Sequence, residues 1–139
     1  AAVSLVWFAF WKPLVVNKRV HFVRTKGGEF ALKVTLSLKS HKNLQDVALH
    51  DHIPQTMQLY HNFGIKPHTI DESARKLTWQ IGHLNAGETR VFSYVVYSKM
   101  RVLGNFHLPL ASATCAVNGK PLHVSSNQTA FVSETITKE

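Results

Sequence analysis

Regular alternation of apolar and polar side chains along residues 29–39 is the feature that most constrains the fold. Every second residue from position 30 to position 38 is apolar, and Lys33, Thr35 and Ser37 lie between them. Side chains of a β-strand point alternately to its two faces, so this segment predicts a strand with one buried and one hydrated face. The dipeptide Gly27-Gly28 in front of it predicts a hairpin turn, with the partner strand over residues 14–24.

The same period of two recurs along the chain, and no helical periodicity of useful length appears. Turns are predicted at Asn85-Ala86-Gly87 and at Asn118-Gly119, and residues 55–75 look irregular. Further strands are predicted around Val47 and Leu49 up to Ile53-Pro54, and over residues 77–81, 88–99, 106–117 and 122–132. Seven or eight short strands with evenly spaced turns predict an all-β sandwich or barrel.

One domain is expected from a length of 139 residues. We expect an apolar N-terminal segment over residues 1–13, a sandwich over residues 14–133 and a polar tail over residues 134–139. Large apolar side chains in the period-two segments are expected to fill the space between the sheets. These predicted core residues are Leu77, Trp79, Ile81, Phe92 and Tyr94.

The first eleven residues, AAVSLVWFAFW, are apolar apart from one serine, and Lys12-Pro13 ends the run. A run this short cannot cross a bilayer as a helix, and no basic stretch precedes it as in an intact signal peptide. Four interpretations remain open: the stub of a membrane segment or leader, an interfacial anchor, a strand that completes a neighbouring subunit's sheet, or an arm packed on its own domain. The candidates for intermolecular or membrane contact are Val6, Trp7, Phe8, Phe10 and Trp11.

The chain is basic, with 16 Lys and Arg against 8 Asp and Glu and a net charge of +8. These residues are dispersed, the densest group being Lys18, Arg19, Arg24 and Lys26, so a solvated surface is the expected arrangement. A functional basic face for an anionic partner, such as a polysaccharide, a lipid headgroup or nucleic acid, is the alternative. No aromatic-plus-basic RNA motif or recognition helix is present, so no sequence-specific recognition of nucleic acid is expected.

Residue types that support catalysis or metal binding do not form a complete set. The single cysteine, Cys115, excludes an internal disulfide and is expected in the core. Nine histidines are present, and His50 and His52 share a strand face, but a pair is only half of a metal site. No Gly-x-Ser-x-Gly turn and no phosphate-binding loop occurs, so we expect no enzyme activity, no metal and no cofactor.

A glycosylation sequon, Asn127-Gln128-Thr129, lies near a late turn. Asn127 would carry a glycan if the chain is exported to a compartment that modifies it. An unused tripeptide is the alternative.

Four short motifs in order resemble the conserved-repeat domain of unknown function found in archaeal and bacterial surface proteins. They are DVALHDHIP at residues 46–54, LTWQIGHLNAGE at residues 77–88, FSYVV at residues 92–96 and GNFHLPLA at residues 104–111. The resemblance covers roughly residues 14–132. It implies an immunoglobulin-like two-sheet sandwich, usually extracytoplasmic, that acts as a stalk, adhesin, envelope or filament component. It carries no catalytic residues over to this chain, which departs from the pattern in being basic, rich in histidine and a single copy.

These observations together predict a non-catalytic structural or adhesive module of the cell envelope. A surface filament assembled through the N-terminal segment is the specific form we expect. The partners would be other copies of the chain or envelope proteins, with membrane contact through residues 1–13 as an alternative. The expected location is extracellular or in the cell envelope, and the alternative function is the binding of an anionic partner through the basic surface.

Overall fold

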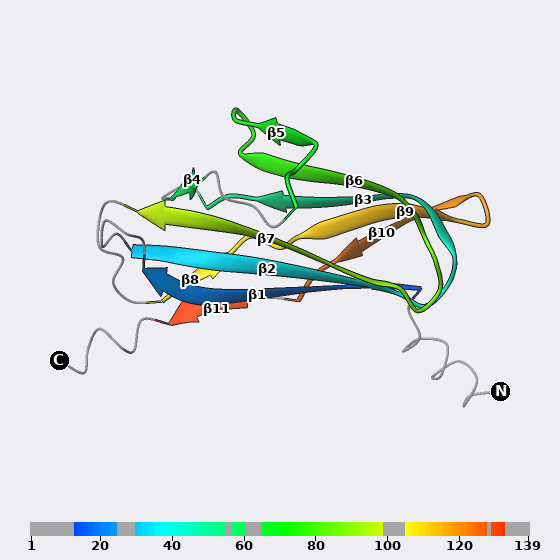
Figure 1. The fold of residues 1–139 in the computed structure, drawn as a ribbon, viewed down its shortest axis with the longest axis horizontal. Coiled ribbons are helices and arrows are strands. Elements are labelled where there is room, and N and C mark those ends of the chain that lie inside the picture. The colour runs from blue at the N-terminus through cyan, green and yellow to red at the C-terminus, as the bar shows by residue number, and fades with distance from the viewer. Residues whose placement is uncertain are drawn as a thin grey trace.

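The computed structural model describes residues 13–24, 30–54, 57–60, 65–98, 105–127 and 129–132, and all regular elements in these ranges are β-strands (Figure 1). None of these ranges contains a helix long and apolar enough to cross a bilayer. The predicted contacts of residues 1–12 and the polar tail lie outside the described residues. The strands are β1 (Leu14–Arg24), β2 (Phe30–Ser40), β3 (Leu44–His52), β4 (Gln58–Tyr60), β5 (Thr69–Asp71), β6 (Lys76–Leu84), β7 (Thr89–Ser98), β8 (Asn105–Leu108), β9 (Ser112–Val117), β10 (Lys120–Ser125) and β11 (Thr129–Val132).

Two sheets face each other and form a sandwich, as the sequence predicts (Figure 1). One sheet has the order β1-β2-β7-β4 and the other the order β10-β9-β3-β6-β5, and both are antiparallel where their strands pair. In a separate pair, β8 and β11, strand β11 contacts β1. The fold class is therefore an all-β, immunoglobulin-like sandwich.

More strands are present than the seven or eight predicted, for two reasons. Two strands of three residues, β4 and β5, lie in the segment that the sequence left irregular. In addition, each of the last two predicted strands is divided. The segment 106–117 breaks at Pro109, which has no N–H for a ladder bond, so β8 and β9 pair in different sheets. The segment 122–132 is also divided, into β10 and β11, although no proline lies between them.

Two pairs of strands that the sequence predicts as hairpins pair antiparallel, and the predicted turn at Gly27-Gly28 in the first lies outside the described residues. Strands β1 and β2 pair antiparallel from Leu14 opposite Ser40 to Arg24 opposite Phe30, as the alternation predicts. Strands β9 and β10 are joined by the predicted two-residue turn, with φ of 50° at Asn118 and 78° at Gly119. Two consecutive residues in the left-handed region are typical of a type I′ turn, whose twist matches that of the strands.

Large aromatic side chains fill the space between the sheets. Trp79 and Tyr94 are fully buried, Leu77 and Phe92 are buried, and Ile81 is partly buried against the same cluster. The Trp79 ring lies 5.5 Å from the Phe92 ring and 6.2 Å from the Tyr94 ring, centroid to centroid. The Trp79 indole Nε1 donates a hydrogen bond of 2.8 Å to the Ile65 carbonyl, so its one polar group is satisfied.

Candidate functional site

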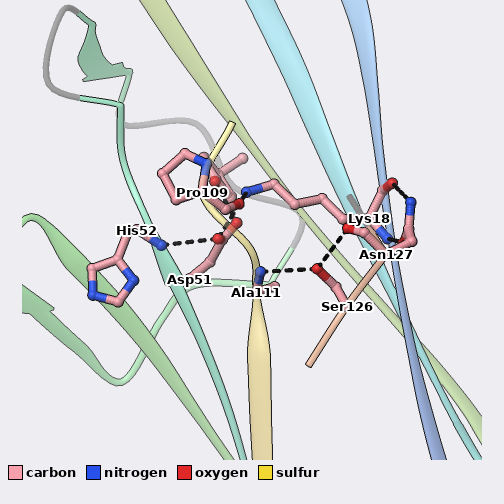
Figure 2. Close-up of polar contacts among 8 residues, drawn as sticks. Lys18, Asp51, His52, Pro109, Ala111, Ser126 and Asn127 are labelled. Atoms are coloured by element: carbon pink, nitrogen blue, oxygen red, sulfur yellow. Dashed lines mark hydrogen bonds and ion pairs between the residues drawn. The ribbon is translucent and has the colours of Figure 1, made fainter. Parts of the chain in front are cut away.

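Lys18 lies inside the sandwich, although the sequence groups it with the surface charges. It occupies an inward-facing position of β1, in phase with Leu14 and Val16, and its side chain has no solvent exposure. Its Nζ donates hydrogen bonds of 2.8 Å to Asp51 Oδ1 and 2.6 Å to the Pro109 carbonyl (Figure 2). The expectation of a solvated Lys18 is wrong, because the period-two phase of β1 turns this side chain toward the other sheet.

Asp51 provides the opposite charge from β3, and its side chain also has no solvent exposure. The Tyr94 hydroxyl donates a bond of 2.5 Å to Oδ2, and the His52 backbone N–H donates one of 2.9 Å to Oδ1. The second bond fixes the backbone at the end of β3, which ends at His52. The ion pair and the hydrogen bonds together give each carboxylate oxygen a partner, as a buried charge requires.

The two acids of this cluster have shifted pKa values. Burial raises the pKa of Asp51, and the charge and hydrogen bond of Lys18, with the bonds from Tyr94 and His52, offset part of that shift. Burial also raises the pKa of Tyr94 well above its usual range, helped by the charge of Asp51 and the hydrogen bond to it. The Tyr94 hydroxyl therefore keeps its proton and acts as a donor to the carboxylate.

Asn127 fastens the chain after β10 to the backbone of Lys18. Its Oδ1 accepts a bond of 2.7 Å from the Lys18 N–H, and its Nδ2 donates one of 3.1 Å to the Lys18 carbonyl (Figure 2). The side-chain amide thus pairs with β1 as a neighbouring strand's peptide group would. The predicted glycan would attach to this same Nδ2, which makes occupancy of the sequon compete with the clamp.

Ser126 completes the connection on the other side. Its backbone N–H donates to the Ala111 carbonyl at 2.8 Å, and its hydroxyl accepts from the Ala111 N–H at 3.0 Å (Figure 2). Because Pro109 and Ala111 belong to the break between β8 and β9, the cluster joins β1, β3, β7, that break and the segment before β11. We call the side chains of Lys18, Asp51, Tyr94 and Asn127 the inter-sheet cluster.

Sequence reasoning placed Tyr94 in the core but missed the burial of Lys18 and the role of Asn127. A signal for Lys18 was present, since it occupies a position of β1 that alternation assigns to the inside. Asp51 likewise points opposite to His50 and His52. Two opposite charges at inward positions of different strands predict a buried ion pair, although pairing across sheets cannot be read from one strand at a time.

The histidines predicted on one face of β3 lie on the outer face of its sheet. His50 Nδ1 lies 3.1 Å from Thr78 Oγ1. Partial burial lowers the pKa of His50, and the neighbouring Lys76, His52 and His123 lower it further. Within the described ranges, no three His, Cys, Asp or Glu side chains gather closely enough to hold a metal ion.

Cys115 and a hollow beside β4 and β5 are two further places with chemically functional side chains. Cys115 is buried, and burial raises the pKa of its thiol, which opposes formation of a reactive thiolate. An open hollow of about 320 Å³ lies beside β4 and β5, and Arg75 at its edge donates to the Pro54 and Met57 carbonyls. Its lining residues are Ile53, Gln58, Leu59, Ile70, Asp71, Glu72 and Arg75.

Solved structures share this fold at low sequence identity. The chain is similar to the RrgA Jo.In complex with a TM-score of 0.63 and 8% identity over 84% of this chain and 77% of that one. It is also similar to an inactive mutant of a GH20 exo-β-N-acetylglucosaminidase from Vibrio harveyi, with a TM-score of 0.55 and 13% identity over 84% of this chain. The match spans only 18% of that glucosaminidase. No protein-family model matches the chain, and no curated protein matches it.

Proposed function

We propose that this domain is a non-catalytic structural or adhesive module of the cell envelope. The observation that supports it is that the buried polar side chains bond to one another. Lys18, Asp51 and Tyr94 are bonded to one another between the sheets, with no exposure for a substrate to reach. A catalytic acid or base has to come within hydrogen-bond reach of a substrate. Here the same residue types hold strands together.

The connectivity suits a module that transmits force. The cluster ties the first strand, β1, to β3 in the opposite sheet, and Asn127 ties the segment between β10 and β11 back to β1. A pull applied through β1 and β11 would therefore load contacts that bridge both sheets and contacts that join β1 to the segment before β11. The resemblance to the conserved-repeat domain of surface proteins favours the same role.

Assembly through the N-terminal segment is part of this proposal. A strand donated to a neighbour would satisfy its own backbone groups, and a head-to-tail contact that does not close into a ring builds a filament. A membrane anchor would use the same Trp7, Phe8, Phe10 and Trp11 without polymerisation.

Surface exposure and truncation test the proposal. In cells that make the protein, an antibody to the sandwich should label intact cells, and external protease should remove the label. Deleting residues 1–13 should abolish filaments in the strand-exchange case, or release a folded domain from membranes in the anchor case. Confinement of the protein to the cytoplasm would overturn the envelope role, and unfolding of the truncated chain would overturn both uses of the segment.

A second candidate function, binding of an anionic polymer, is favoured by the outer face of the sheet β1-β2-β7-β4. Arg19, His21, Lys33 and Lys39 are exposed and in phase with one another across β1 and β2. Strands β1, β2, β4 and β7 contain no Asp or Glu. Such a one-signed face attracts anions through screened Coulomb forces.

A charge-reversal experiment separates this candidate from the first. The variant Arg19→Glu with Lys33→Glu should lose binding to immobilised acidic polysaccharide, whereas Lys76→Glu, on the opposite sheet, makes a matched control. Binding in the parent should fall steeply with salt. Equal retention of both variants would overturn the basic-face hypothesis.

A further inference from the structure

The buried pair of Lys18 and Asp51 presents an amine and a carboxyl group in contact, at a place that water does not reach. Nζ lies 2.8 Å from Oδ1, and both side chains have no solvent exposure. The two residues belong to strands of different sheets, so the fold itself holds the groups together. Contact fixed in this way gives an intramolecular reaction a high effective concentration.

We propose that Lys18 and Asp51 condense into an amide, an intramolecular cross-link between the two sheets, with release of one water molecule. The product replaces two buried charges with one neutral amide. Burying an ion pair costs desolvation free energy that its Coulomb attraction offsets only in part, and the amide removes that cost. The proposal does not depend on where the domain works, because the bond is a property of the isolated chain.

The reaction balances with the atoms of the pair alone. A proton first passes from the Nζ ammonium to Oδ1, which leaves a neutral amine beside a neutral carboxylic acid. Burial favours this uncharged form, and it already raises the pKa of Asp51. Nζ then bonds to Cγ and gives a tetrahedral intermediate with its negative charge on Oδ2. A second proton moves from Nζ to the Oδ1 hydroxyl, the Cγ–Oδ1 bond breaks, water leaves, and the carbonyl reforms at Oδ2.

Two groups beside the pair are placed to assist this reaction. The Tyr94 hydroxyl donates to Oδ2 at 2.5 Å, which is where negative charge develops in the intermediate. A fixed donor at that position stabilises an oxyanion strongly in a dry site. The Pro109 carbonyl, 2.6 Å from Nζ, is placed to accept the one N–H that remains on the amide. Tyr94 is thus a positioned donor, and Pro109 holds the product.

The side-chain amide of Asn127 also has a carbonyl group near Lys18, but the geometry does not favour a bond between Lys18 Nζ and this group. Its Oδ1 accepts from the Lys18 N–H and its Nδ2 donates to the Lys18 carbonyl, so the amide is already engaged with the Lys18 backbone. A link to Asn127 would also release ammonia in place of water. Mass and linkage therefore distinguish the two bonds.

Mass spectrometry of the folded, purified chain tests the proposal. After denaturation its intact mass should be lower than the sequence mass by one water, and proteolysis should yield a branched peptide that joins Lys18 to Asp51. Lys18→Met should restore the full sequence mass expected for that variant. A folded parent chain with the full sequence mass would overturn the proposal. So would loss of water without the branched peptide, as a succinimide would give, or loss of ammonia with a link to Asn127.

The rate of bond formation tests the part given to Tyr94. The full chain is produced in a short pulse of synthesis, and its intact mass is followed with time after the pulse. In Tyr94→Phe the ring still fills the core, but the loss of the donor to Oδ2 should slow the reaction about a hundredfold or more. An unchanged rate would overturn the role of Tyr94.

Discussion

Two regions of the interior are stabilised by different kinds of interaction, and Tyr94 belongs to both. On one side its ring faces Trp79, whose other neighbour is Phe92. On the other side its hydroxyl bonds to Asp51, which holds Lys18. The aromatic region is stabilised by removal of apolar surface from water, which does not depend on direction. The inter-sheet cluster depends on direction, because each buried donor and acceptor needs its partner in place.

The difference has a consequence for how the fold is specified. Apolar side chains of similar volume can exchange with modest cost, so the aromatic region alone would permit small shifts of one sheet against the other. Lys18 and Asp51 meet only when β1 and β3 have one relative position. The cluster therefore selects that position, and the aromatic region supplies most of the burial.

Removing one charge of the cluster should have the largest effect. Asp51→Leu leaves the Lys18 ammonium without its counter-ion, which costs about 3–5 kcal/mol for a buried pair. The Tyr94 hydroxyl loses its acceptor at the same time, which adds about 1–3 kcal/mol. Urea denaturation followed by tryptophan fluorescence would measure the total loss of unfolding free energy.

A second substitution in the same background sharpens this result. Lys18→Met added to Asp51→Leu removes the orphaned charge and should recover most of the loss, since apolar replacements of buried pairs are often neutral. Both variants lack the Asp51 carboxyl group and neither can form a bond between Lys18 and Asp51, so the comparison holds whether or not the parent forms one. If the double variant is no more stable than Asp51→Leu alone, the charge is not the cause.

The aromatic region should respond next in size. Trp79→Ala removes a fully buried ring and should destabilise the fold by about 3–5 kcal/mol, as for other large core aromatics. The loss should vary little with salt or pH, because the contacts removed are those of the ring with Phe92 and Tyr94 and a bond to the Ile65 carbonyl. Thermal melting monitored by circular dichroism checks it, with Val91→Ala on the exposed side of β7 as a control. A melting temperature within a degree or two of the parent would contradict the role of Trp79 in the core.

Sequence reasoning predicted the aromatic region better than the cluster, and the two regions show why. Apolar alternation marks Leu77, Trp79 and Tyr94 on their own strands, without knowledge of their partners. Lys18 is exposed or buried according to whether an acceptor reaches it from another sheet, and that acceptor, Asp51, is 33 residues away in the chain. Lysine is almost never buried without a partner, so the residue type alone predicts an exposed side chain. The break at Pro109 was missed for a similar reason, because its effect depends on which strand pairs with each half.

Cutting the clamp at the edge of the cluster should have a smaller effect. Asn127→Ala removes two hydrogen bonds to the Lys18 backbone, and each contributes about 0.5–1.5 kcal/mol, with the lower value expected at an exposed residue. Asn127→Asp keeps the acceptor for the Lys18 N–H and should lose about half as much. Hydrogen exchange at the Lys18 amide provides a local measurement. Unchanged protection in Asn127→Ala would contradict the clamp.

The smallest expected effect lies on the outer face of β3, where His50 neighbours Asp51 in sequence but points the other way. Its pKa is lowered in the folded state, so the folded chain binds fewer protons there than the unfolded chain. The resulting stability is present above the ordinary histidine pKa of about 6.5 and is lost as the pH falls through the lowered value. A free Asp51 carboxyl has the opposite sign, because its raised pKa contributes stability at acid pH that is lost as the pH rises.

Substitution of His50 isolates its share of this pH dependence. His50→Gln should lose less stability than the parent between about pH 7.5 and about pH 5.5, a window that spans the ordinary histidine pKa. His123→Gln should have a weaker effect of the same sign, since His123 is the last of the causes that lower the pKa of His50. Urea midpoints at the two pH values provide the measurement. An equal or larger acid loss in His50→Gln would show that partial burial and Lys76 do not disfavour the imidazolium, and that the outer face of β3 is as freely hydrated as an isolated strand.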